Sequence, residues 1–156
     1  GERPDGSSMT GDSDAAPPGS VGAVVVTHGG LATELLEATE RIVGPTAYFR
    51  AVSIDWDDDI ADARDQIKKA IAEVAAPGGV LIFTDMFGGT PTNVSISFLE
   101  SGSVEILTGV NLPMLVKLAN LQGSGASLAE IARQVRARGQ ESVYIASEIL
   151  STQDQL

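Results

Sequence analysis

From Val21 onward, short β-branched and apolar runs alternate with segments whose apolar residues recur at helical spacing. This alternation is the strongest constraint on the fold. A chain in which each strand is followed by a helix favours parallel strands joined by helical crossovers. We therefore expect a mostly parallel sheet with helices on both faces and right-handed connections. The five predicted strands are Gly22–Thr27, Tyr48–Ile54, Val80–Thr84, Val104–Leu107 and Val143–Ala146.

Two predicted helices separate the first three strands. Apolar residues recur at helical spacing over Leu31–Val43 and stop at Gly44-Pro45, which is typical of a helix end. A second apolar stripe covers Ile60–Val74 and follows the acidic run Asp57–Asp59. Acidic residues favour a helix N-terminus, so this run predicts where the second helix begins.

Two further helices are predicted from their capping residues. One is expected to begin with Thr90 as its N-cap and Pro91 as its first helical residue. The last begins with a capping box formed by Ser127 and Glu130 and stops near Gly139. Together with the strands, these helices predict one doubly wound, flavodoxin-like unit with strand order 2-1-3-4.

The ends of the chain differ in composition from this alternating region. Residues 1–20 are rich in Pro, Gly, Ser and Asp and predict a disordered tail. Residues 21–150 are expected to form the folded domain and residues 151–156 a short C-terminal tail. Residues 1–8 precede Met9, and the sequence fits two origins for them: an expression remnant or a native segment.

Composition narrows the classes of function. The chain has no cysteine and one histidine, which argues against disulfides, thiolate nucleophiles and a multi-histidine metal site. Its formal net charge of −11 argues against a nucleic-acid partner. No apolar run reaches the ~20 residues that span a bilayer, and no secretory signal precedes the first strand. We therefore expect a cytoplasmic protein with no membrane insertion, metal or cofactor.

Polar residues and glycines follow the first and third predicted strands. The first strand runs into His28 and Gly29, and the third runs into Asp85 and then Gly88-Gly89-Thr90. These two strands are neighbours in a 2-1-3-4 sheet, and ligands bind beyond the carboxyl ends of such strands, where the strand order reverses. We therefore expect His28 and Asp85 to lie side by side.

A histidine beside a carboxylate can act as a nucleophile. The carboxylate accepts from one ring nitrogen and leaves the other with its lone pair directed outward. Gly29 allows an incoming group to approach, while Gly88, Gly89 and Thr90 offer backbone N–H groups and a hydroxyl to a phosphoryl group. A purely structural interpretation remains: His28 ends a strand, the glycines serve tight turns and Asp85 caps a helix.

Other phosphate and metal chemistries fit less well. A receiver domain would also use an aspartate after its third strand, but it needs an acidic pair after the first strand and a lysine after the fifth. Here those positions hold Thr27-His28 and Ala146–Glu148. The run Asp57–Asp59 is more typical of a solvated helix start than of a cation site, and no Walker A loop is present.

Three sequence motifs follow the predicted strand ends: THG at 27–29, DMFGGTP at 85–91 and GVNLPML at 109–115. Together, and in this order, they resemble the IIA component of the mannose-type bacterial phosphoenolpyruvate:sugar phosphotransferase system (PTS). The resemblance covers about Val21 to Ile149. It implies that the final strand is antiparallel and, in dimeric members, supplied by the partner subunit.

The resemblance also implies roles for individual residues. His28 would be the phosphorylated nucleophile, and Asp85 would orient its ring. Thr90 stands where the family uses a small hydroxyl residue to contact the phosphoryl group, beside the amides of Gly88 and Gly89. Gly30 departs from some relatives, which carry a large aromatic residue there, and the smaller residue is expected to widen the groove.

The third motif has two interpretations of equal weight. By resemblance, its residues line a rim that contacts the partner proteins. In the structural alternative, the asparagine lies near a helix N-cap and the leucines enter the core without any ligand. The residues concerned are Asn111, Leu112, Pro113 and Met114.

The resemblance implies a phosphotransferase that accepts a phosphoryl group from the carrier protein HPr, passes it to a IIB component and forms a homodimer. Similar domains serve as regulatory phosphoproteins uncoupled from sugar uptake, or as phosphoryl donors in dihydroxyacetone kinase systems. The GVNLPML motif favours the mannose type over the kinase-linked type, and leaves transport and regulation both open. Sugar selectivity belongs to the membrane components of such systems, so the sequence does not indicate the sugar.

Overall fold

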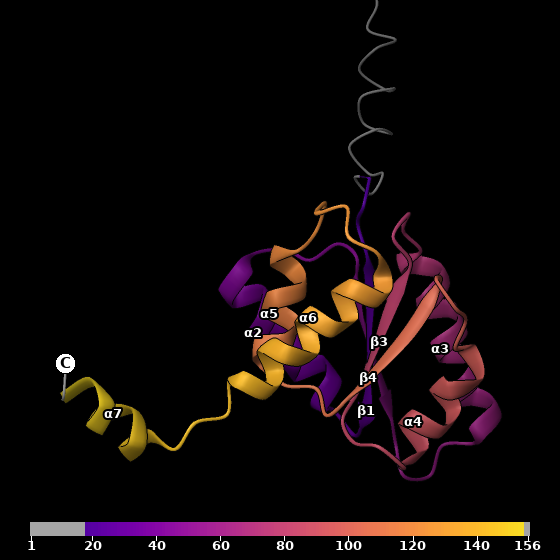
Figure 1. The fold of residues 1–156 in the computed structure, drawn as a ribbon. Coiled ribbons are helices and arrows are strands. Elements are labelled where there is room, and N and C mark those ends of the chain that lie inside the picture. Colours follow the sequence, from indigo (N-terminus) through magenta and orange to yellow (C-terminus); the bar gives the residue numbers. More distant parts are fainter. Residues whose placement is uncertain (1–17, 155–156) are drawn as a thin grey trace, which may run out of the picture.

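The computed structural model describes residues 18–154 and shows one sheet of four parallel strands in the order β2-β1-β3-β4 (Figure 1). Each strand lies within one residue of the bounds predicted from the sequence, and the predicted strand order is confirmed. The strands are β1 (Gly22–His28), β2 (Phe49–Ile54), β3 (Val80–Thr84) and β4 (Val104–Thr108).

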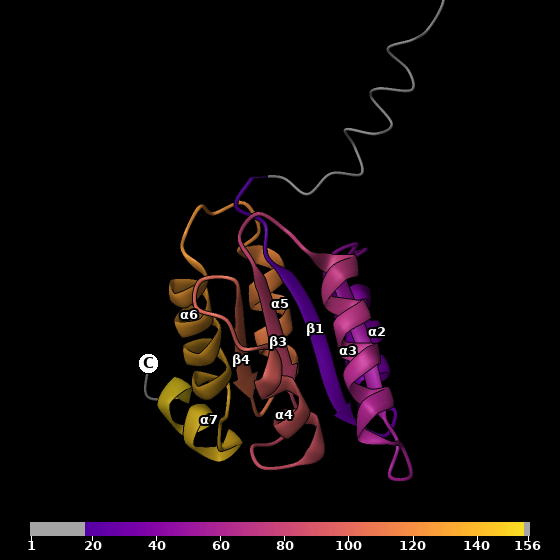
Figure 2. The same cartoon turned by 90° about the vertical axis from the view of Figure 1, so that its right-hand side faces the viewer.

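Helices cover both faces of this sheet, as predicted (Figures 1 and 2). One face carries α2 (Leu31–Val43), α5 (Leu112–Asn120) and α6 (Leu128–Glu141). The other face carries α3 (Ile60–Val74) and α4 (Thr90–Ser95), which continues into the 3-10 turn η1 (Ile96–Phe98). None of the helices in residues 18–154 has the length and hydropathy that crossing a bilayer requires.

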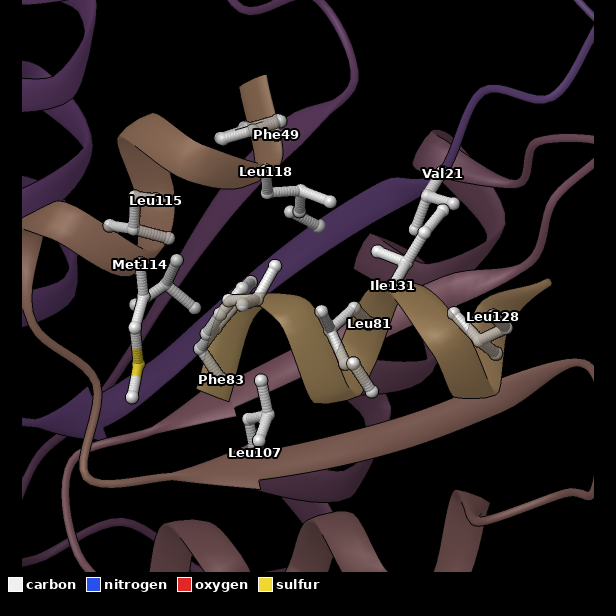
Figure 3. Close-up of a cluster of buried hydrophobic side chains, with 14 of the residues drawn as sticks. Val21, Phe49, Leu81, Phe83, Leu107, Met114, Leu115, Leu118, Leu128 and Ile131 are labelled. Carbon is white, nitrogen blue, oxygen red and sulfur yellow. The ribbon is translucent and has the colours of Figure 1, made fainter. Parts of the chain in front are cut away.

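The sheet separates two apolar cores, of which the larger lies under α5 and α6 (Figure 3). Phe83, Leu115 and Ile131 are fully buried there. The central strand β1 is buried along six of its seven residues, as expected of a parallel strand covered on both faces. Burial of each large apolar side chain stabilises the fold by about 1.5–3 kcal/mol, which fixes the strand ends that carry the site.

Two helix boundaries differ from the prediction. Gly89, and not Thr90, is the N-cap of α4, so Thr90 is its first helical residue. The helix α6 begins at the predicted cap, where the Ser127 hydroxyl accepts from the Glu130 N–H at 3.2 Å, but it continues past Gly139 to Glu141. Gly139 is buried against Met114, so this glycine serves helix packing and does not end the helix.

The predicted fifth strand at Val143–Ala146 is not formed in the described chain. Val143, Tyr144 and Ile145 are 62–77% exposed, and the chain then enters α7 (Ala146–Asp154), which stands apart from the sheet in Figure 1. A strand needs a neighbouring edge to satisfy its backbone N–H and C=O groups. Within one chain this segment does not reach the open edge of β4.

Most of the predicted N-terminal tail, residues 1–17, lies outside the described residues. The last residue of that segment is packed against the fold. Ser20 is buried, and its carbonyl accepts a hydrogen bond from the Gly78 N–H at 2.7 Å. At the other end, α7 extends to Asp154, beyond the start of the predicted C-terminal tail.

Candidate functional site

The register of the sheet brings the ends of β1, β2 and β3 together. β1 pairs with β2 so that His28 lies opposite Ile54, and with β3 so that Val26 lies opposite Thr84. The residue after Thr84 therefore emerges beside His28. This is the edge at which parallel α/β sheets bind ligands.

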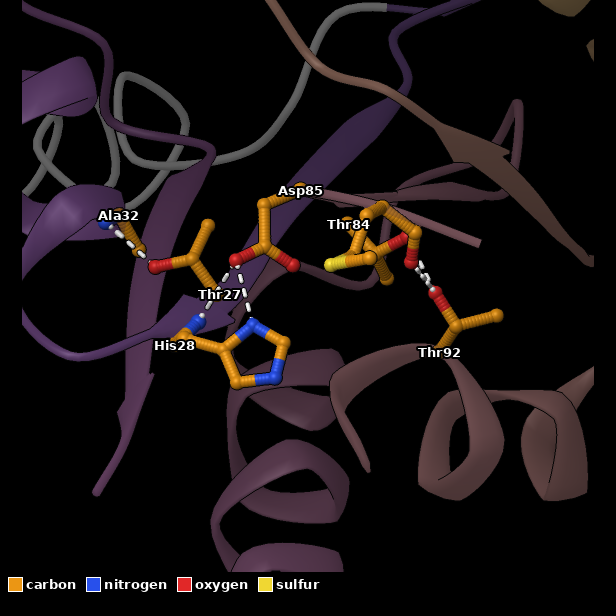
Figure 4. Close-up of polar contacts among 7 residues, drawn as sticks. Thr27, His28, Ala32, Thr84, Asp85 and Thr92 are labelled. Carbon is orange, nitrogen blue, oxygen red and sulfur yellow. Dashed lines mark hydrogen bonds and ion pairs between the residues drawn. The ribbon is translucent and has the colours of Figure 1, made fainter. Parts of the chain in front are cut away.

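The structure brings His28 and Asp85 together (Figure 4). The ring Nδ1 of His28 lies 2.7 Å from Oδ2 of Asp85, and the backbone N–H of His28 donates to the same oxygen at 2.9 Å. Both side chains are largely buried, with exposed fractions of 19% and 13%. Asp85 therefore fixes both the backbone and the ring of His28.

The carboxyl of Asp85 favours its ionised form. Burial works to raise its pKa, but hydrogen bonds from the backbone and ring of His28 and the charge that this ring can carry outweigh burial, so the pKa lies below its usual value of 3.8. An ionised carboxylate only accepts hydrogen bonds, so Nδ1 must hold a proton. In the neutral ring the lone pair is then on Nε2.

Nε2 of His28 is the ring nitrogen that Asp85 does not contact. It points away from Asp85 in Figure 4 and makes no hydrogen bond within the described part of the chain. Gly89 lies directly beside it: a Cβ at this position would come within 3.1 Å of Nε2 and 2.8 Å of Cε1. Glycine at position 89 therefore keeps space open beside Nε2.

Hydroxyl groups hold the loop that carries Asp85. Thr92 donates to the carbonyl of Met86 at 2.6 Å, and its hydroxyl lies 2.7 Å from that of Thr84. Because Thr92 has a single hydroxyl hydrogen, Thr84 must be the donor between the two. These buried bonds fix the start of α4 against the end of β3.

The remaining residues of the predicted phosphoryl seat surround this loop. Gly29 follows His28 with φ of +54°, and Gly88 has φ of +92°, a conformation that favours glycine. Thr90 is exposed in the first turn of α4. Their contact with a phosphoryl group stays a prediction.

The predicted partner rim has clear structural roles in the chain itself. Asn111 caps α5, accepting from the Met114 N–H at 3.1 Å, and its amide donates to the carbonyl of Gly139 at 3.1 Å. Met114 is only 4% exposed, and Leu112 and Pro113 are half-buried. These contacts match the structural interpretation of the motif, and its contact with a partner protein stays a prediction.

Sequence reasoning missed Trp56. Its indole stacks on the ring of His28 with centroids 4.8 Å apart and an angle of 25° between the planes. The signal was available in principle, because β2 neighbours β1 and residues just beyond Ile54 must pass the end of β1. The path of the loop after Ile54 could not be predicted from the sequence.

The acidic run at 57–59 is used in this same loop. Asp58 accepts from the Asp55 N–H at 2.9 Å, and Asp59 caps α3 by accepting from the Ala61 N–H at 3.4 Å. The helix start predicted for this run is confirmed. Among residues 18–154, no three His, Asp or Glu side chains are grouped so that they could hold a metal ion.

A family model and several known proteins match this chain. A family model described as the PTS system fructose IIA component, EIIA-man, matches residues 22–136. The fructose-specific EIIA component of the PTS from Bacillus subtilis (strain 168) is 28% identical over 131 residues, covering 83% of this chain and 89% of that protein. The sorbose-specific EIIA component from Lacticaseibacillus casei is also 28% identical, covering 83% of this chain and 93% of that protein.

Solved structures show the same fold. The PTS IIA protein associated with the fucose utilization operon of Streptococcus pneumoniae has a TM-score of 0.73 and 30% identity, covering 86% of this chain and 98% of that one. The mannose/sorbose-specific IIA subunit from Enterococcus faecalis has a TM-score of 0.71 and 26% identity, covering 81% and 94%. The likeness therefore extends over nearly the whole length of these relatives.

Proposed function

The chain belongs to the EIIA-man family of PTS IIA components, and on this basis we propose that it is a phosphocarrier that takes up a phosphoryl group on Nε2 of His28 and passes it on. The observation that carries the proposal is the 2.7 Å contact between Nδ1 of His28 and Asp85. This contact leaves Nε2 as the atom with an outward lone pair.

In the proposed reaction, Nε2 attacks the phosphorus of a phosphohistidine on the donor. The new bond between Nε2 and phosphorus forms as the donor's bond between phosphorus and nitrogen breaks, and that electron pair returns to the donor ring. The imidazole of His28 becomes positive while Nδ1 keeps its proton. The ionised Asp85 stabilises this charge through a bond that is already in place, so no reorganisation is needed.

The start of α4 is the proposed seat of the phosphoryl oxygens. Gly89 places backbone directly beside Nε2, and Thr90 presents an exposed hydroxyl in the next position. Gly88 and Gly29 leave the approach free of side chains. Because Asp85 stabilises the positive ring and the backbone N–H groups and Thr90 hydroxyl would bind the phosphoryl oxygens, we propose that the transfer requires no metal ion.

The proposed donor is the phosphorylated carrier HPr, and the proposed acceptor is a IIB component. Family membership supports an exchange of this kind. Relatives named for fructose, sorbose and mannose are all 28% identical to this chain, which fits a conserved phosphoryl step rather than sugar recognition. The mannose-specific relative from Escherichia coli is an EIIAB protein of which the chain spans 39%.

We also propose a homodimer in which the segment 143–146 pairs with β4 of the partner subunit. In the single chain β4 is an open edge, and an apolar cavity of about 660 Å³ lies beside it. Leu107 from β4 and the exposed Val143 both line this cavity. Pairing across subunits would supply the edge that this segment lacks within one chain.

Transfer to a IIB component tests the second half of the proposal. The chain is first labelled with radioactive phosphate from phosphoenolpyruvate, enzyme I and HPr, then purified and mixed with a IIB domain of a mannose-type system. We expect the label to leave this chain and appear on the IIB domain. Retention of the label would leave the chain as an acceptor and would contradict its role as a carrier.

A further inference from the structure

The only tryptophan of the chain stacks on its only histidine. Trp56 is 82% exposed, so its ring contributes little to the core. Its face nevertheless lies against the imidazole of His28 at a centroid distance of 4.8 Å. An indole placed in this way covers one face of the ring whose far nitrogen is the proposed nucleophile.

The loop that carries Trp56 is held on both sides. Before it, the Gly29 N–H donates to the carbonyl of Ile54 at 3.0 Å, which ties the end of β2 to the residue after His28. Across it, Asp55 and Asp58 exchange two hydrogen bonds: each backbone N–H of the pair donates to an oxygen of the other, at 2.9 and 3.0 Å. These bonds fix the backbone of the turn from which the indole projects.

We infer that Trp56 is a positioning residue for phosphoryl transfer, which fixes the plane of the His28 ring and stabilises the positive charge of that ring during transfer. Asp85 holds the ring at Nδ1, and this contact alone permits the ring to tilt about the hydrogen bond. The stacked indole restricts that tilt and keeps Nε2 beside Gly89. This inference rests on the proposed phosphocarrier function.

The charge on the ring gives the indole a second effect. When the bond between Nε2 and phosphorus forms, the imidazole becomes cationic, and an aromatic face attracts a cation in contact with it. The attraction is stronger after the bond begins to form than before, so it accelerates the chemical step and does not merely improve binding. The two rings are nearly parallel, which places the indole face against the cation.

A comparison of two phosphoryl donors distinguishes a role of Trp56 in the chemical step from a role in docking of a partner protein. Phospho-HPr must dock on the surface of the chain, whereas potassium phosphoramidate is a small molecule that phosphorylates imidazole without docking. We expect Trp56→Ala to slow phosphorylation roughly two- to fivefold with both donors, in the rate at saturating phospho-HPr and in the second-order rate constant with phosphoramidate. Trp56→Phe keeps an aromatic face and is expected to restore most of the rate.

Ile42→Ala is the matched control, because Ile42 is also an exposed apolar residue, 59% accessible, but lies in the last turn of α2. It is expected to react at the rate of the wild type. Because Trp56 is so exposed, its variants are expected to unfold at the wild-type temperature. A wild-type rate for Trp56→Ala with phosphoramidate, or an effect confined to the KM for phospho-HPr, would overturn the inference.

The fluorescence of Trp56 is a second measurement, and it would not respond to phosphorylation if Trp56 had only a structural role. Trp56 is the sole tryptophan, so phosphorylation of His28 is expected to change its emission in the purified phosphoprotein, while His28→Gln treated in the same way shows no change. Unchanged emission in the fully phosphorylated wild type would contradict the stacking. A wild type that accepts phosphoryl groups from phosphoramidate but not from HPr would instead contradict the proposed function and leave the positioning role standing.

Discussion

His28 directs its backbone N–H and its ring Nδ1 to a single carboxylate oxygen of Asp85, at 2.9 and 2.7 Å. Two donors from one residue on one acceptor tie the end of β1 and Nδ1 of the ring to the same carboxylate. The remaining ring nitrogen, Nε2, lies beside Gly89. The candidate site is therefore organised before any partner binds.

Asp85→Asn tests the charge of this contact. The amide oxygen can still accept one hydrogen bond, but it does not stabilise a positive ring as a carboxylate does. We expect phosphoryl transfer from phospho-HPr to slow roughly ten- to hundredfold, the equivalent of about 1.5–3 kcal/mol for a hydrogen bond to a charged group. Rapid-quench kinetics measure this rate, and a wild-type rate would show that Asp85 is only a structural cap.

Acid unfolding tests the lowered pKa of Asp85. Because the pKa in the folded state lies below the usual value of 3.8, ionised Asp85 stabilises the fold at pH values above 3.8. This contribution is lost as the pH falls through the lower pKa of the folded state. Urea unfolding at several pH values is expected to show the wild type and Asp85→Asn converging in stability below pH 3.8. A gap that stays constant down to the acid limit would contradict the shift.

Gly89→Ala tests the space beside Nε2. The added Cβ would meet Cε1 of His28 at 2.8 Å, so the ring must move out of line or the loop must shift. We expect phosphorylation to fall at least tenfold while the melting temperature changes little, because a misplaced nucleophile loses much of its rate. In Gly30→Ala the added Cβ meets no atom within 4 Å, and that variant is expected to react far faster than Gly89→Ala. Equal rates in the two variants would argue against a role for Gly89.

Deletion of residues 143–156 tests the proposed exchange of strands. The helix α6 ends at Glu141, so this deletion removes α7 but leaves the sheet and the helices that cover it intact. We expect the full chain to be a dimer and the shortened chain a monomer with a lower melting temperature. Light scattering gives both masses. If the shortened chain keeps the dimer mass, the segment does not join the subunits.

The order of elements was predictable because each signal is local. The run Ala23–Val26 is apolar without interruption, and Gly44-Pro45 is typical of a helix end. The pairing of His28 with Asp85 followed from strand order alone, since the ends of neighbouring parallel strands meet at one edge. These parts of the fold depend on periodicity and topology, which the sequence carries directly.

The features that were not predicted depend on contacts between residues that are far apart in the sequence. The segment 143–146 has the composition of a strand, but forming one requires an edge that a single chain does not bring to it. Gly139 resembles a helix end, yet the close approach of Met114 makes it an interior residue of α6. Trp56 reaches His28 only because the turn at 55–58 folds back toward β1, and no periodic signal encodes that turn.

The central claim is that His28 carries the phosphoryl group, and its chemical stability on the protein tests this most directly. The chain is labelled with radioactive phosphate from phosphoenolpyruvate, enzyme I and HPr, and the label is then exposed to mild acid or to alkali. A phosphoramidate on His28 is expected to lose the label in acid and keep it in alkali, because protonation makes the ring nitrogen a good leaving group. His28→Ala is expected to take up no label and to stay folded. A label that alkali removes, or one that His28→Ala still acquires, would place the phosphoryl group on another residue and contradict the account.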